Sequence, residues 1–394
     1  MKLLLNSVLM MICISACSNI QSPTPYKTKQ KPLFLDDEFL GFELVIIETE
    51  SNIFALDHQM KEMVAKKLLT EKNIKDRALK LIKNIFVNNN RIISYDRNAN
   101  ITAREAYHSN TANCLSLTIM AYALATEAGL NVRFQQIDIP EYWVRNGRYN
   151  LLTGHVNLLV NRADTFRKTI ISERSSLQID FDPQASKSTF KRFFIDKKTV
   201  LAMFYNNKGA ESLVDGDYIS AYSYFKAAAL IAPSFSSTWS NLGVLYKLTN
   251  QFQEAEVAYH YALNLDHNNL TAMNNLAIIL TQQGNIEQAQ VIQHKLHLKR
   301  SRNPYYFALL ADEAFHDGQI EQAIKFYNKA IRLERRVDEF YYRLAQVYFH
   351  AEEVALAKKA LIKAIAYTKN SALEATYIAK LNSLKQLNNS KKIQ

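Results

Sequence analysis

The stretch WSNLGVLYKLTNQFQEAEVAYHYALNL, residues 239–265, decides the fold of the second half of the chain. Its small residues Gly243, Ala255 and Ala262 stand between large apolar residues at helical spacing. Small residues allow two helices to approach closely, and large ones fill the gaps that remain. The arrangement recurs with a period of 34 residues over 202–371, in five copies without an insertion. One helix pair cannot cover its apolar face alone, so the pattern predicts an all-α solenoid of stacked pairs.

The copies keep this pattern to different degrees. The third copy is the weakest, with Gln293 and Leu296 where an aromatic residue and an alanine are usual. Residues 372–394 predict a capping helix and tail that hide the last apolar face. Turns within the pairs are predicted at three glycine-containing sites: Asp215-Gly216-Asp217, Gly284-Asn285 and Asp317-Gly318-Gln319.

Together, the period and the small-residue positions resemble the tetratricopeptide repeat (TPR). The resemblance implies that a protein or peptide binds along a concave face. That face is expected to include Asn274, Tyr305 and Tyr342, with Gln346 beside them. Most such positions in a solenoid are ordinary solvated surface, and this remains the alternative.

Residues 34–200 have a different texture. Apolar spacing predicts helices within 55–86 and at 114–128, the second ending at Gly129. Alternation of apolar and polar residues then predicts strands at 132–139, 155–161 and 177–182. Helices followed by strands indicate an α+β domain with an antiparallel sheet. The segment 184–200 is interpreted as a linker with a short helix.

The N-terminus indicates the compartment. Residues 1–16 combine Lys2 with an apolar run too short to span a membrane, as in a secretory signal peptide. The ending Ile14-Ser15-Ala16-Cys17 resembles a bacterial lipobox, which implies cleavage before Cys17 and lipidation of that cysteine. Residues 17–33 predict an extended tether. The expected location is the cell envelope, as an outer-membrane lipoprotein that faces the periplasm; an ordinary signal peptide or a short membrane anchor is the alternative.

Cys114 is the one cysteine in the body of the protein, since Cys13 leaves with the signal and Cys17 carries lipid. A lone thiol predicts no disulfide framework. It stands at the predicted start of the helix, with Thr111 and Asn113 as possible caps. A helix start and a nearby histidine are what a thiol nucleophile needs. The alternative is that Cys114 is a small, inert core residue.

A base and an orienting carboxylate follow in order. His155 begins a predicted strand, and Asp180 lies on the next one, with Asp182 as the alternate. The backbone N–H of Cys114 is a candidate oxyanion donor. The side chain of Asn113 is a second candidate, with a plain capping role as the alternative.

This order of Cys on a helix, His on a strand and Asp on the next strand resembles the transglutaminase-like superfamily, which has a papain-like fold. The segments that carry the resemblance lie within about 90–185: ISYDRNANITAREAY, NCLSLTIMAYALATEAGLNVRF, GHVNLLV and IDFDP. Two positions depart from the family pattern, Ala112 in place of glycine and Val156 in place of an aromatic residue. With the lipobox and the repeats, the chain resembles bacterial transglutaminase-like TPR lipoproteins. The resemblance implies cysteine chemistry on amide bonds, and we favour hydrolysis over transamidation.

Other chemistries find little support in the sequence. The motifs of zinc proteases, phosphate-binding loops and serine hydrolases do not occur, so no metal or cofactor is expected. The net charge of +11 is spread along the chain, which together with export argues against nucleic acid as a partner. The expected partners are a protein or peptide at the repeats and the membrane at the N-terminal lipid. A non-catalytic TPR scaffold of the envelope is the alternative function.

Overall fold

A computed structural model describes residues 34–86, 94–96, 99–109, 111–146, 149–161, 176–181, 190–368 and 371–390. The predicted signal peptide (1–16), the predicted tether (17–33) with Cys17, and Asp182 lie outside these residues. Among the described residues, no helix has the length and apolar character needed to cross a membrane.

Residues 34–48 form a strap that lies against the first helices of the repeat half. It contains the short 3₁₀ helices η1 (Asp36–Glu38) and η2 (Phe42–Leu44). The Phe39 ring stacks on Tyr222, with ring centroids 4.4 Å apart. The Tyr222 hydroxyl donates to the Asp36 carboxylate at 2.6 Å. This segment was predicted as part of the α+β half, but Phe39 is buried against the repeat helices, and Phe34 and Phe42 pack there half-buried.

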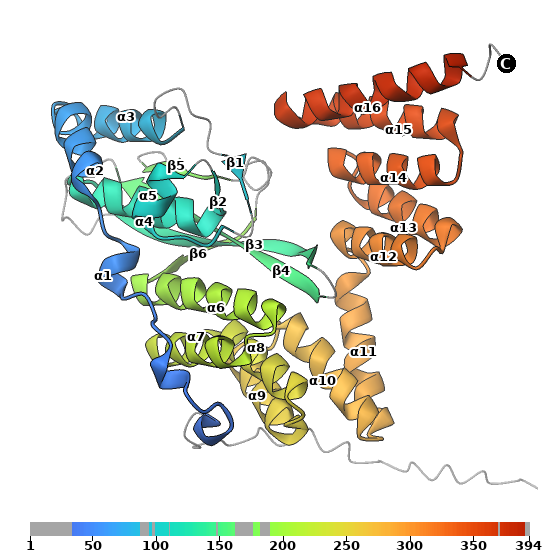
Figure 1. Ribbon diagram of the computed structural model, residues 1–394, viewed down its shortest axis with the longest axis horizontal. Coiled ribbons are helices and arrows are strands. Elements are labelled where there is room, and N and C mark those ends of the chain that lie inside the picture. Colours follow the sequence, from blue (N-terminus) through green and yellow to red (C-terminus); the bar gives the residue numbers. More distant parts are fainter. Residues whose placement is uncertain are drawn as a thin grey trace, which may run out of the picture. The chain divides into compact units, whose positions relative to one another are not determined.

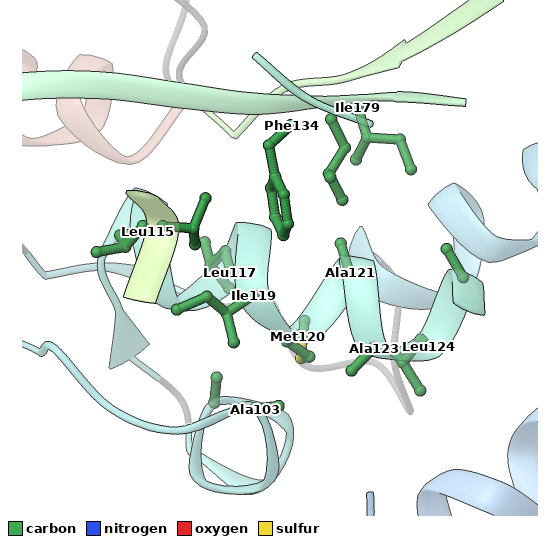
Figure 2. Packing of buried hydrophobic residues seen from close by; sticks show 14 of the residues in the cluster. Ala103, Leu115, Leu117, Ile119, Met120, Ala121, Ala123, Leu124, Phe134 and Ile179 are labelled. Carbon is green, nitrogen blue, oxygen red and sulfur yellow. The ribbon is translucent and has the colours of Figure 1, made fainter. Parts of the chain in front are cut away.

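In the α+β half, the long helix α5 (Cys114–Glu127) is buried. The helices around it are α1 (Glu50–Ile53), α2 (His58–Met63) with its π-helical continuation η3 (Val64–Leu68), α3 (Ile74–Phe86) and α4 (Ala103–His108). Figure 2 shows Phe134 and Ile179 pointing from the sheet onto α5, with Ala103 of α4 on another side. Helix α5 is apolar on all sides, which is why it is central. It ends before Gly129, whose φ of +71° is the predicted glycine stop.

The sheet of this half has four strands in the order β5-β4-β3-β6. The strands are β3 (Asn131–Asn146), β4 (Tyr149–Asn161), β5 (Ser176–Ile179) and β6 (Arg192–Ile195), and each neighbouring pair is antiparallel. The predicted antiparallel sheet is therefore confirmed. Two further strands, β1 (Ser94–Tyr95) and β2 (Thr111–Ala112), pair in parallel just before α5.

The interpretation of 184–200 as a linker with a short helix was wrong at 192–195, although a helix does begin within the segment, at Lys197. Residues 192–195 form the edge strand β6, with Ile195 opposite Phe134. The guanidinium of Arg133 lies 3.7 Å from the centre of the Phe194 ring, which holds the edge in place. Four residues are too few to show a strand period, so pairing with β3 decides the outcome.

The second half consists of helix pairs, which Figure 1 shows following one another. The pairs are α6 (Lys197–Asp215) with α7 (Tyr218–Ile231), α8 (Ser236–Leu248) with α9 (Phe252–Leu265), α10 (Leu270–Gln282) with α11 (Ile286–Arg300), α12 (Pro304–His316) with α13 (Ile320–Leu333), and α14 (Asp338–His350) with α15 (Val354–Tyr367). The capping helix is α16 (Ser371–Ser390), which buries Tyr377, Leu381 and Leu384 against the last pair. Five pairs and a cap confirm the predicted solenoid.

The turn within each pair uses one left-handed backbone position. It falls at residues 216, 250, 284, 318 and 352, one period apart. Glycine fills it in three pairs, whereas Asn250 has φ of +66° and Glu352 has φ of +61°. Glycine adopts this conformation without a steric cost, and a side chain with a Cβ does not.

Stacking between pairs changes after the third copy. Helices α7, α9, α13 and α15 each pack on the helix that follows, but α12 packs against β3 instead of covering α11. Apolar side chains of α11 are consequently exposed, including Val291 at 52% and Leu298 at 59%. This is the copy with the weakest sequence pattern, where Gln293 stands in place of the aromatic residue that packs against Gly243 in the second pair, Tyr259.

Candidate active site

The start of α5 is fixed by a buried asparagine. The Asn113 side-chain oxygen accepts the backbone N–H of Ser116 at 2.8 Å, so Asn113 is the N-cap. Its amide nitrogen donates to the side-chain oxygen of Asn100 at 3.4 Å. The backbone N–H of Asn113 donates to the carbonyl of Ala99 at 3.1 Å. The structure therefore gives Asn113 the capping role, and it adds Asn100, which the sequence analysis missed, as its buried partner.

Cys114 is the first residue of α5. Cys114 forms no disulfide, and the residue is 8% exposed. The first N–H groups of a helix have no partner within the helix, and the N–H of Cys114 is one of them. The thiol forms a side-chain hydrogen bond with His155.

His155 lies on β4 and is 2% exposed. Its Nε2 lies 2.8 Å from Oδ1 of Asp180, which leaves Nδ1 as the nitrogen for the thiol. Burial lowers the pKa of His155, but hydrogen bonds and charge interactions with Asp180 and Cys114 outweigh burial and raise the pKa from 6.5 to about 10. The structure thus brings Cys114, His155 and Asp180 together, as the sequence order suggested.

Asp180 follows β5 and is held by two amides. Its Oδ2 accepts from Nδ2 of Asn157 at 2.9 Å and from Nε2 of Gln178 at 2.9 Å. Asn157 is two residues after His155, and Gln178 is two residues before Asp180. Side chains two apart on a strand share a face, so the alternation could have indicated both. Asn157 and Gln178 are the functional residues that motif reasoning missed.

The face that carries the triad holds further buried polar atoms. Asn157 pairs in register with Gln135 of β3. The side-chain oxygens of both residues are buried and have no hydrogen-bond partner. The site thus offers acceptors for N–H groups in addition to the thiol of Cys114, the imidazole of His155 and the carboxylate of Asp180. In the described part of the chain, no cluster of three His, Cys, Asp or Glu side chains is placed to hold a metal ion.

The three residues expected in the repeat groove each contact a different neighbour. Asn274 accepts from Nη1 of Arg300 at 3.3 Å. Tyr305 packs edge-on against Phe340, with centroids 5.3 Å apart. Tyr342 stacks on Tyr377 of the capping helix at 4.8 Å. Asn274 is therefore part of a polar cluster, whereas the two tyrosines also support packing within the array.

Comparison with known proteins bears on the repeats. Two family models described as tetratricopeptide repeat match residues 248–313 and residues 305–336 with 338–371. The second half of the chain carries TPR repeats. No curated protein matches the chain.

Several solved structures are similar to the chain at low identity. MamA 41-end from Desulfovibrio magneticus RS-1 is 18% identical, with 44% of this chain and 96% of that one covered and a TM-score of 0.25. Pseudomonas aeruginosa pilF is 19% identical, with 49% and 88% covered and a TM-score of 0.29. YrrB, a TPR protein with an unusual peptide-binding site, is 15% identical, with 44% and 90% covered and a TM-score of 0.25. The assignment of the TPR array rests on the repeat models and on the helix pairs themselves.

Proposed function

We propose that this protein is an envelope-anchored TPR scaffold that binds a protein or peptide through its array. The match of residues 248–371 to TPR models carries the proposal, because repeats of this class bind proteins or peptides. A photoreactive amino acid at Gln346, exposed on α14, should cross-link a partner in cells. The same group at Lys359, exposed on α15 of the same pair, is the matched control. Equal cross-linking at both positions would contradict binding along the first helices of the pairs.

The envelope location is part of the proposal. The segment Ile14-Ser15-Ala16-Cys17 supports lipidation at Cys17 and anchoring in the outer membrane, facing the periplasm. Replacing Cys17 with Ser should move the protein from the membrane fraction to the soluble fraction and abolish labelling by a fatty-acid analogue. Retention of both properties in Cys17→Ser would refute the lipid anchor.

The geometry of Cys114, His155 and Asp180 favours a second candidate function, a transglutaminase-like cysteine enzyme that acts on amides. Cys114 as thiolate attacks the carbonyl carbon, and the Cys114 N–H binds the oxyanion. The C–N bond breaks as His155 gives its proton to the leaving amine, which leaves a thioester. Water, activated by His155, then releases the acid and restores the thiol. An amine in place of water would give transamidation. Asp180 keeps the imidazole oriented throughout.

The reactivity of Cys114 tests this chemistry. Iodoacetamide should alkylate Cys114 fast at pH 6, because an imidazolium with a raised pKa persists beside the thiol at that pH. His155→Ala should slow the reaction at pH 6 by about 10- to 100-fold, and the two rates should converge near pH 9. Cys114→Ser provides the unlabelled control. Slow labelling with the pH profile of an ordinary thiol in both proteins would rule out an activated nucleophile.

A further inference from the structure

A buried polar cluster joins the TPR array to the sheet that carries His155. Arg300, the last residue of α11, binds the Glu141 carboxylate with two nitrogens: Nε lies 3.0 Å from Oε2 and Nη2 lies 3.2 Å from Oε1. The side chains of Arg300 and Glu141 are 10% and 13% exposed. Asn303 Nδ2 donates to the backbone carbonyl of Glu141 at 2.8 Å. Asn274 Oδ1 accepts from Nη1 of Arg300 at 3.3 Å, so the third guanidinium nitrogen is also hydrogen-bonded.

The third copy is built for this contact. Helix α11 continues through Arg300 to a helical C-cap at Ser301, with φ of −60°. The corresponding helices of the second and fourth copies end one residue earlier, at extended caps. Those caps are Asp266 and Glu334, which stand one period on either side of Arg300. A cation at this position belongs to the third copy and not to its two neighbours. It lies where α12 leaves α11 uncovered and packs on β3 (Figure 1).

These contacts recognise two features of a bound segment, a carboxylate side chain and a backbone carbonyl. Two parallel hydrogen bonds from one arginine select a planar carboxylate by its charge and by its shape. The Asn303 side chain donates to the backbone carbonyl of the same residue, which Glu141 presents from the extended strand β3. Asn303 is itself held, since its Oδ1 accepts the N–H of Tyr305 at 2.9 Å as the cap of α12. The cluster is therefore preformed on the array, and Glu141 enters it from the hairpin.

We propose that Arg300, Asn303 and Asn274 form a recognition site for an acidic residue in an extended segment of a partner protein. Glu141 of the β3–β4 hairpin occupies this site as an internal ligand, and the partner displaces it. The inference rests on the proposed binding function of the TPR array and names the chemistry of its partner. A buried arginine without a carboxylate is strongly destabilising, so the site exchanges one acidic occupant for another.

The same displacement reaches the thiol site. The pairing of β3 with β4 shifts between Ile137, which faces His155, and Tyr142, which faces Thr153. Glu141 lies within this shift, directly before Tyr142, and Gly154 is the β4 residue between the two paired positions. The proposal therefore includes an effect on the thiol site: when Glu141 is displaced, the shift loses one contact, and His155 borders the same shift through its partner Ile137.

A labelled peptide of residues 137–146, IDIPEYWVRN, is the probe. The Glu141→Gln protein should bind it at least about tenfold more tightly than wild type, because the neutral side chain of the internal ligand no longer competes. A matched peptide with Gln in place of its Glu should bind neither protein. Adding Arg300→Gln to the Glu141→Gln protein should abolish binding. Equal affinity of wild type and Glu141→Gln, or binding that survives Arg300→Gln, would overturn the recognition site.

Two further measurements keep the outcome decisive. If Glu141→Gln does not fold, the charge-swapped double variant Glu141→Arg with Arg300→Glu is used. It should have the free energy of unfolding of wild type but should not bind the peptide that contains Glu. The alkylation rate of Cys114 at pH 6 should change when saturating peptide is added to wild type; an unchanged rate refutes the link to the thiol site. If the peptide binds but no partner cross-links at Gln346, the scaffold function is refuted and the recognition site is supported. If a partner cross-links at Gln346 but the peptide does not bind, the recognition site is refuted and the scaffold function is supported.

Discussion

The thiol site and the TPR array hold their shapes in opposite ways. At the thiol site, side chains from three separate segments meet in a buried polar network, and His155 and Asp180 are 25 residues apart. In the array, the same turn returns at each period and most pairs contact mainly their neighbours, with α12 on β3 as the exception. A change in the network leaves several buried groups without partners at once, whereas a change in the array affects one or two contacts. The difference predicts how steeply each region responds to substitution.

Removal of the buried carboxylate should have the largest effect. Asp180→Ala leaves His155, Asn157 and Gln178 without their shared acceptor. We expect the free energy of unfolding to fall by about 3–5 kcal/mol, and alkylation of Cys114 at pH 6 to slow. Urea unfolding and iodoacetamide labelling measure the two effects. Glu127→Ala, an exposed carboxylate at the end of α5, is the control and should change neither quantity appreciably.

The dependence of stability on pH should single out the network. The pKa of His155 is about 10 when folded, against 6.5 for an ordinary histidine. The interactions of protonated His155 that raise its pKa add to the free energy of unfolding. This contribution is fully present below pH 6.5 and is lost as the pH rises through 10. Between these values, wild type should lose up to about 1.4 kcal/mol per pH unit relative to His155→Gln. Urea unfolding of both proteins at pH 6, 8 and 10 checks the sign; parallel curves would contradict it.

Within the array, the close approach in the second pair should be the most sensitive point. A Cβ added to Gly243 would lie 2.6 Å from the ring of Tyr259, which is buried. Gly243→Ala should therefore cost about 1–3 kcal/mol through overpacking. If the added methyl group had room, alanine in the helix would instead raise the free energy of unfolding by about 1 kcal/mol. The sign of the change therefore shows whether the helices are in close contact at this position. Ala277→Gly, at the same repeat position of the third copy, is the counterpart and should lose about 1 kcal/mol by helix propensity alone.

Two asparagine caps allow a matched comparison of the regions. Asn113 caps α5 through Ser116 N–H at 2.8 Å, and Asn269 caps α10 through Ala272 N–H at 2.9 Å. Each change to Ala should cost about 1 kcal/mol of stability, because the cap bond is the same. Asn113→Ala alone should also alter the alkylation rate of Cys114, which follows the cap directly. An equal effect of Asn269→Ala on that rate would show that general loosening, not the position of the helix start, is responsible.

The same division explains what the sequence could predict. The period of the array, its glycine turns and the apolar helix after Cys114 follow from local patterns, and the structure has them. Asn157 and Gln178, whose amides donate to Asp180, lie in strands whose alternation indicates which residues share a face. Their place beside the carboxylate could therefore have been predicted. The pair of Arg300 with Glu141 was not, because its members are 159 residues apart and neither lies in a motif. The edge strand 192–195 was missed for a related reason, since its partner β3 and not its own sequence determines it.

The smallest effect should come from the turn position that the array repeats. Glu352 adopts φ of +61° where three other pairs use glycine, and its side chain lies in the exposed turn after α14. Glu352→Gly removes the steric cost of that conformation and should raise the free energy of unfolding by about 0.5–1 kcal/mol. Gly318→Ala, at the same position of the fourth pair, should lower it by a similar amount, about 1 kcal/mol. Because no Cβ contact is at stake at Gly318, opposite signs at the two sites isolate the backbone term. Equal signs would mean that contacts of the Glu352 side chain, and not its backbone, determine the stability of the turn.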